Sequence, residues 1–152
     1  MKKILLSLLL LFAGLTLTEA QTKPYLSLSD AQRITAAATE KAMAEGWNVV
    51  IVILDDGGNL ISLQRMDGVQ VGSVEVAHAK AKSAVFFKRP TKVFEDAMKA
   101  EGGARIATLP NAVGVEGGLP IFKDGVIVGS IGVSGVTSAQ DGIIAAAGIA
   151  KY

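Results

Sequence analysis

Apolar residues recur along the chain at two different periods, and these predict a fold that combines helices with strands. Residues 28–46 follow the helical period, with a capping box of Ser29 and Gln32 at the start and Gly46 as a terminating residue. The inward positions of this helix are mostly small, namely Ile34, Ala37, Ala38 and Ala42. A helix with such a face is expected to pack closely on a sheet.

The first hairpin is predicted by the two runs that follow this helix. Residues 47–55 (WNVVIVILD) form a continuous β-branched run, which is typical of a central strand buried on both faces. After the turn sequence DDGGN, residues 60–66 alternate between apolar and polar side chains. This alternation predicts that Ile61, Leu63 and Arg65 share one face of a second strand.

The middle of the chain changes to a helical period. Residues 74–85 (VEVAHAKAKSAV) carry one apolar stripe, formed by Val74, Ala77, Ala81, Ala84 and Val85. His78, the single histidine of the chain, falls near the edge of this stripe. Thr91 is expected to cap a short helix through Lys99, and the glycine-rich residues 102–118 are expected to form a loop with room for one short strand.

A second hairpin and a final helix are predicted near the C-terminus. Two apolar runs in residues 119–135 are separated by residues 124–125, an Asp-Gly pair that favours a type I′ turn. A helix is expected over residues 139–150, with Thr137 or Ser138 as its N-cap. Hairpins flanked by helices favour an α/β domain of the α+β kind, with an antiparallel sheet covered by helices. The length of 152 residues, without internal repeats, indicates a single domain over residues 21–152.

Residues 1–20 have the pattern of a secretory signal peptide. Lys2 and Lys3 precede an apolar stretch over residues 4–17, and the small-residue exit TEA follows. The stretch is shorter than the roughly 20 residues that a membrane-spanning helix needs. The mature protein is therefore expected to be periplasmic or secreted, without stable membrane insertion after signal cleavage.

Charge and cysteine content exclude several partners and sites. Removal of residues 1–20 takes Lys2, Lys3 and Glu19 from 15 basic and 14 acidic residues, which leaves 13 of each. A neutral chain lacks the basic excess that nucleic acid or an anionic membrane requires, so no nucleic-acid partner is expected. The chain has no cysteine, which excludes disulfides, thiolate metal sites and a cysteine nucleophile.

Short motifs recur between residues 65 and 141: Arg65 to Gly68, Lys80-Ala81, Arg89 to Thr91, Gly117 to Ile121, Asp124-Gly125, Gly129 to Gly135 and Gln140-Asp141. In their order and spacing they resemble the GlcG/HbpS family of haem-binding or haem-degrading-like proteins, which includes the C-terminal domain of PduO-type adenosyltransferases. The resemblance implies a profilin-like, five-stranded antiparallel sheet flanked by helices, assembled into a homo-oligomer. It also implies haem as a cofactor, because some exported members bind haem.

His78 and Met66 are the candidate ligands for haem iron. His78 is the stronger metal-ligand candidate, and its alternative interpretation is a packing residue at the edge of an apolar stripe. Met66 ends the second strand beside Arg65, so a thioether facing a porphyrin and a guanidinium binding a propionate would lie together. The plainer alternative is a packing methionine and a surface charge. Met43, on the first helix, is expected to fill the core.

The last strand offers a second candidate site. The Ser134 hydroxyl, Gly135 and the amides that open the last helix are expected to receive a carboxylate, from a haem propionate or from a small organic acid. Gly129 and Gly132 lie within this strand and indicate the close approach of either a helix or a flat ligand.

The sequence supports three hypotheses about function. The first is an exported haem-binding protein that sequesters or senses haem, with haem degradation as an additional activity. The second is a small organic-acid binding protein or catabolic enzyme, and the third is a structural oligomer without a ligand. No nucleophile elbow is present, so the sequence assigns no enzymatic reaction. Four acidic residues lie in predicted turns, where they shape the backbone: Asp55, Asp56, Asp67 and Asp124.

Overall fold

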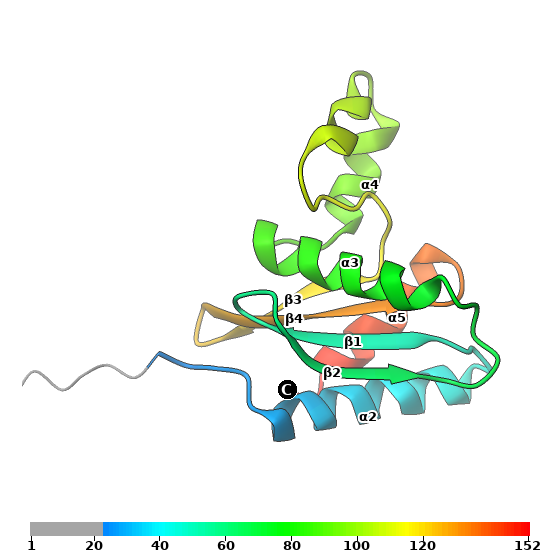
Figure 1. Ribbon diagram of the computed structural model, residues 1–152, viewed down its shortest axis with the longest axis vertical. Coiled ribbons are helices and arrows are strands. Elements are labelled where there is room, and N and C mark those ends of the chain that lie inside the picture. The colour runs from blue at the N-terminus through cyan, green and yellow to red at the C-terminus, as the bar shows by residue number, and fades with distance from the viewer. Residues whose placement is uncertain (1–22) are drawn as a thin grey trace, which may run out of the picture.

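Four antiparallel strands form one sheet between two layers of helices in the part of the chain that the structure describes (Figure 1). The computed structural model describes residues 23–152, so the predicted signal peptide at residues 1–20 lies outside it. The sheet order is β2-β1-β4-β3, with β1 at Val50–Asp55, β2 at Leu60–Arg65, β3 at Gly118–Lys123 and β4 at Val126–Ser134. This arrangement confirms the α+β class.

The prediction of five strands was wrong for residues 23–152, where the sheet has four. The tract with room for a further strand instead contains the 3₁₀ helix η1 (Gly103–Thr108), followed by irregular backbone up to β3. This tract is rich in glycine and lacks alternation of apolar and polar residues, so nothing in it favours an extended strand over compact turns.

The helices divide between the two faces of the sheet. α2 (Leu28–Ala44) and α5 (Ser138–Ile149) pack together on one face, and α3 (Ser73–Phe87) covers β1, β3 and β4 on the other (Figure 1). α4 (Lys92–Lys99) and η1 extend from α3 away from the sheet. Across residues 23–152, no helix combines the length and the apolar character that crossing a membrane requires.

β1 is buried on both faces, as its sequence predicts. Ile51 and Ile53 belong to the core under α2 and α5, while Val50, Val52 and Leu54 belong to the core under α3. Each of these side chains is 0% exposed. Two cores therefore share one strand, and β1 lies at the centre of the domain.

α3 approaches β4 closely because Gly132 has no side chain. A methyl group added at Gly132 would overlap the carbonyl oxygen of Ala77 and crowd Ala81. Two residues away on the same strand face, Ser130 Oγ donates a hydrogen bond of 2.8 Å to the carbonyl oxygen of Ala81. The structure thus accounts for Gly132 by close helix packing, one of the two predicted interpretations.

The start of α2 differs from the prediction. Ser27 is the N-cap: its Oγ accepts from the Asp30 N–H at 3.1 Å, and the Asp30 carboxylate accepts from the Ser27 N–H at 3.1 Å. The predicted box of Ser29 and Gln32 was wrong because a start at Ser27 leaves the preceding Leu26 free to pack in the core, where it is 5% exposed.

The structure confirms the predicted cap of the last helix and the predicted turn of the second hairpin. α5 begins after Thr137, whose N–H donates to the Gln140 side chain at 3.1 Å while its Oγ1 accepts from the Gln140 N–H at 3.4 Å. In the β3–β4 turn, Asp124 has a φ of 51° and Gly125 a φ of 76°. Two successive positive φ angles confirm the predicted type I′ turn.

The register of β2 corrects the predicted face of Ile61. Leu63 and Arg65 lie opposite Val52 and Val50, so both point to the face that α3 covers. A β-bulge near the start of β2 turns Ile61 to the other face, where it packs against the core under α2.

Thr91 has a different role from the predicted helix cap. Its side chain makes no capping bond to α4. Instead its N–H donates to the carbonyl oxygen of Gly118 at 3.0 Å, and its Oγ1 accepts from the Gly118 N–H at 3.0 Å. The two bonds fasten the start of α4 to the start of β3.

Candidate functional site

The structure separates the predicted site residues into three places. His78 and Arg65 lie on the face of the sheet that α3 covers, on the side of β2. Met66 points to the opposite face, and Ser134 and Gly135 are enclosed at the end of β4.

His78 is half-buried on α3. An α-helix turns about 100° per residue, so His78 lies about 160° around the helix axis from Lys80. Lys80 points toward Asp141 of α5, on the side of β3 and β4. The imidazole therefore points to the opposite flank, above β1 and the edge strand β2.

Three further side chains complete this open edge. On the α3 face of β2, Leu63 is 40% exposed, and the exposed Arg65 uses one guanidinium N–H to donate to the carbonyl oxygen of Val69 at 3.4 Å. The ring of Phe86, which is 44% exposed, lies against Gly58 in the β1–β2 turn. The α3–β2 flank is the name used below for four residues: His78, Leu63, Arg65 and Phe86.

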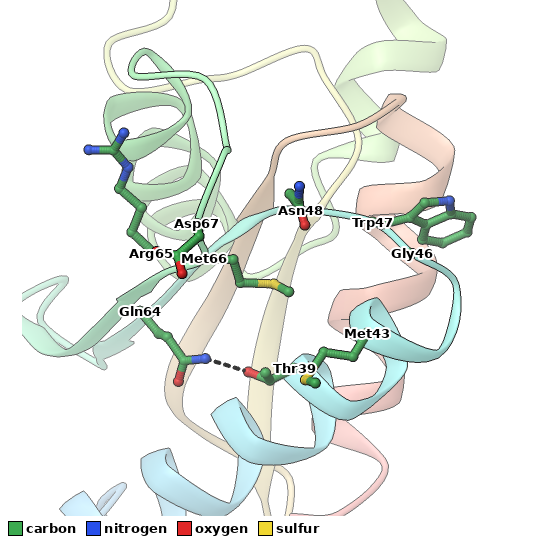
Figure 2. A pocket seen from close by; sticks show the side chains of 9 residues that line it. All are labelled: Thr39, Met43, Gly46, Trp47, Asn48, Gln64, Arg65, Met66 and Asp67. Carbon is green, nitrogen blue, oxygen red and sulfur yellow. Dashed lines mark hydrogen bonds between the residues drawn. The ribbon is translucent and has the colours of Figure 1, made fainter.

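A shallow hollow of about 490 Å³ opens on the other face of the sheet, between α2 and the end of β2 (Figure 2). Its lining residues are Thr39, Met43, Gly46, Trp47, Asn48, Gln64, Arg65, Met66 and Asp67. Met66 points into this methionine hollow, whereas the Arg65 side chain points away from it (Figure 2). The Met66 thioether and the Arg65 guanidinium were predicted to contact the same ligand. The structure does not place these two groups on one side of the sheet.

Met43 lines the same hollow and is not a core residue. Its side chain is 68% exposed, so the prediction that it fills the core was wrong. The inward positions of α2 are taken by smaller residues, including Ala38 and Ala42. Met43 follows Ala42 directly and is turned outward.

Ser134 and Gly135 have internal partners. Ser134 is 4% exposed, and its Oγ donates to Ser73 Oγ at 3.3 Å. A methyl group at Gly135 would overlap the backbone that precedes β1. The Val136 N–H, near the start of α5, donates to Asp141 Oδ1 at 3.3 Å. The structure therefore does not bring Ser134, Gly135 and free helix amides together at an open surface.

A buried ion pair between Lys80 and Asp141 was not predicted. Their side chains are 1% and 3% exposed, and Lys80 Nζ lies 2.7 Å from Asp141 Oδ2. Lys80 also donates to the carbonyl oxygen of Val133 at 3.0 Å. Burial raises the pKa of the Asp141 carboxyl, while the hydrogen bonds from Lys80 and from the backbone oppose that rise. The pair fastens α3 to β4 and α5.

Two glycines make room for this pair. A methyl group at Gly117, whose φ is +124°, would lie 2.9 Å from Lys80 Nζ and 2.8 Å from Asp141 Cβ. At Gly118 it would overlap the backbone of Lys80. The available signal was Lys80 itself, because it falls on the apolar stripe of α3, where a lysine is rarely buried without a partner.

Carboxylates and the imidazole do not gather into a metal centre. Within residues 23–152, no group of three or more His, Asp and Glu side chains is placed to hold a metal ion. Haem iron differs from a free ion because the porphyrin supplies most of its ligands and the protein adds axial side chains such as histidine. A haem site can therefore use a single imidazole from the protein, without a cluster of metal ligands.

Comparison with known protein families identifies the family to which the chain belongs. The model of the family described as "Haem degrading protein HbpS-like" matches residues 26–150. The chain belongs to this HbpS-like family. Within the region they share, it is 40% identical to Protein GlcG of Escherichia coli (strain K12) over 114 residues, which are 75% of this chain and 84% of GlcG.

Solved structures similar to this HbpS-like protein include one with haem. A PduOC:heme complex has a TM-score of 0.78 and 32% sequence identity, covering 85% of this chain and 96% of that chain. HbpS has a TM-score of 0.78 and 30% identity, covering 87% and 93% of the two chains. The family resemblance is confirmed, and PduOC shows that haem binding occurs among these proteins.

Most motifs that indicated the HbpS-like family build its interior. Lys80, Gly117, Gly118 and Asp141 form the buried ion pair and its surroundings. They therefore specify the fold rather than a ligand site. Among the motif residues described above, Arg65 is exposed and Met66 lines a hollow.

Proposed function

We propose that this HbpS-like protein binds haem at the α3–β2 flank, with His78 as an axial ligand of the iron and Arg65 as a partner of a propionate. The observation that supports haem as the ligand is the similarity to the PduOC:heme complex, at 32% identity and a TM-score of 0.78. The residues are assigned from the geometry of this chain alone.

The α3–β2 flank suits haem in three respects. His78 offers an imidazole, a common axial ligand, that is half-buried on α3. Leu63 and Phe86, which are 40% and 44% exposed, add apolar surface for a porphyrin. The Arg65 guanidinium is available for a charge-assisted hydrogen bond to a carboxylate.

The other predicted site residues give weaker support to a ligand site. The methionine hollow is separated from His78 by the sheet, so Met66 and His78 cannot share one face of a porphyrin. The small-acid hypothesis loses support because Ser134 and the Val136 N–H already have internal partners. The proposed role of Arg65 depends neither on the methionine hollow nor on the small-acid site at Ser134.

A hemin titration followed at the Soret band tests the proposal. We expect a Soret shift in the wild type that saturates at a defined stoichiometry. His78→Ala should weaken hemin binding at least tenfold, because the bond to iron is lost. Arg65→Ala should weaken it up to about fivefold, since one exposed ion pair contributes at most about 1 kcal/mol.

Met66→Leu is the matched control, because it removes the other candidate iron ligand while keeping the side-chain volume. It should bind hemin as the wild type does. A wild type without a saturating shift would overturn haem binding itself. Wild-type affinity in His78→Ala together with a loss in Met66→Leu would overturn the choice of the α3–β2 flank.

The proposal includes export and assembly into a homo-oligomer. The predicted signal peptide supports haem sequestration or sensing outside the cytoplasm. We expect the mature chain to begin at Gln21. Intact-mass measurement of the secreted or periplasmic fraction checks this start. Light scattering checks assembly, and the mass of one mature chain would contradict it.

A further inference from the structure

Two thioethers line the methionine hollow, and packing explains only one of them. Met66 is half-buried against the core under α2, whereas Met43 is 68% exposed. An exposed methionine contributes little to the core, so stability does not account for its position. Both side chains reach the same hollow from different elements, α2 and the end of β2 (Figure 2).

A hydrogen bond joins the two elements that carry the methionines. Gln64 Nε2 donates to Thr39 Oγ1 at 2.9 Å and so joins β2 to α2. Met66, two residues beyond Gln64, continues the ladder through its N–H to the carbonyl oxygen of Val49 at 3.1 Å. Two strand residues advance about 6.7 Å and four helix residues about 6 Å. Met66 and Met43 therefore lie at similar distances along β2 and α2 beyond the hydrogen bond between Gln64 and Thr39.

Oxygen donors also line the hollow, from the amides of Asn48 and Gln64, the Asp67 carboxylate and the Thr39 hydroxyl. The Thr39 hydroxyl accepts from Gln64 and donates to the carbonyl oxygen of Thr35 at 2.7 Å. Asp67 lies at the exposed rim. Thioethers are soft ligands, which select Cu(I) over Mg²⁺, Ca²⁺ or Mn²⁺.

We propose that the methionine hollow binds a soft monovalent metal ion, Cu(I) or Ag(I), through the Sδ atoms of Met43 and Met66. The chain has no cysteine and one histidine, and that histidine lies on the other face of the sheet. Within the described residues, the hollow is lined by two thioethers, one from α2 and one from the end of β2. The site is independent of the haem site proposed above.

Ag(I) titration of protein labelled with ¹³C in the methionine methyl groups tests this proposal, in nitrate buffer without chloride. Ag(I) is redox-inert and serves as the probe for both ions. We expect the Met43 and Met66 methyl signals to shift together and to saturate at one ion per chain. Met98, which is 41% exposed on α4, is the internal reference and should not shift over that range.

Three leucine variants assign the effect. Met43→Leu and Met66→Leu should each weaken Ag(I) binding at least tenfold, and Met98→Leu should leave it unchanged. His78→Ala should also leave the methionine shifts unchanged, which separates this site from the haem site. Unshifted Met43 and Met66 signals, or shifts equal to those of Met98 at each Ag(I) concentration, would overturn the proposal.

Discussion

The two flanks of α3 differ in chemistry although they belong to one helix. Toward β3 and α5, Lys80 is paired with Asp141, and Ser83 Oγ accepts a backbone N–H at 3.1 Å. Toward β2, His78 is half-buried and Leu63 is 40% exposed. The closed flank holds the fold together, and the open flank is free for a ligand. Substitutions on the two flanks should therefore affect stability and binding separately.

The largest expected effect is the loss of the buried pair. Lys80→Met leaves the Asp141 carboxylate buried without its partner, which should lower the free energy of unfolding by about 3–5 kcal/mol. Urea denaturation measures this change. Lys82→Met is the matched control on the same helix: Lys82 lies over the Phe86 ring, 5.4 Å from its centroid, and the change should stay within about 1 kcal/mol.

A double variant separates the charge from its pairing. Lys80→Met with Asp141→Leu removes both charges and should cost less than Lys80→Met alone, because no unpaired charge remains buried. Equal stabilities of the Lys80→Met and Lys82→Met proteins would show that the closed flank does not hold the fold.

A smaller effect is expected where α3 contacts β4. Gly132→Ala adds a methyl group that overlaps the Ala77 carbonyl oxygen, so α3 must shift, at a cost of about 1–3 kcal/mol in thermal or urea unfolding. Gly72→Ala, at the start of α3, meets no atom within 4 Å and should change stability by less than about 1 kcal/mol. An unchanged unfolding midpoint in Gly132→Ala would contradict close packing of α3 on the sheet.

The smallest effect concerns two aspartates in the first turns of their helices. The hydrogen bond from Ser27 lowers the pKa of Asp30 below its ordinary value of 3.8, whereas burial raises the pKa of Asp141 above 3.8. NMR titration of the two carboxyl groups should give this order. Because the pKa of Asp30 is lowered in the fold, its contribution to stability is complete above pH 3.8 and is lost as the pH falls through the folded value. The stability lost at low pH should amount to about 1 kcal/mol or less. Asp30→Asn should remove this pH-dependent loss of stability.

Local signals in the sequence predicted most of the fold. The β-branched run of β1, the Asp-Gly turn and the Thr137 cap act within a few residues, and the structure confirms each of them. The start of α2 was misplaced by two residues because several serines compete as caps. Burial of Leu26, a tertiary contact, decides between them.

Long-range contacts account for what the sequence did not predict. Lys80 and Asp141 are 61 residues apart, so the position of Lys80 on the apolar stripe indicates a buried partner without identifying it as Asp141. The bulge that turns Ile61 away from Leu63 depends on pairing with β1. The candidate residues His78, Arg65 and Met66 were chosen by residue type, but their division between two faces of the sheet required the register of β2.

Paramagnetic broadening by bound ferric haem tests most directly where the ligand lies. In amide spectra recorded with substoichiometric hemin, we predict that signals of residues 62–65 and 75–79 broaden first. Signals around Asp141 and those of residues 43–48, on the α2 side of the methionine hollow, should stay sharper. Broadening confined to residues 43–48, with sharp signals for Leu63 and His78, would contradict the assignment of haem to the open flank of α3.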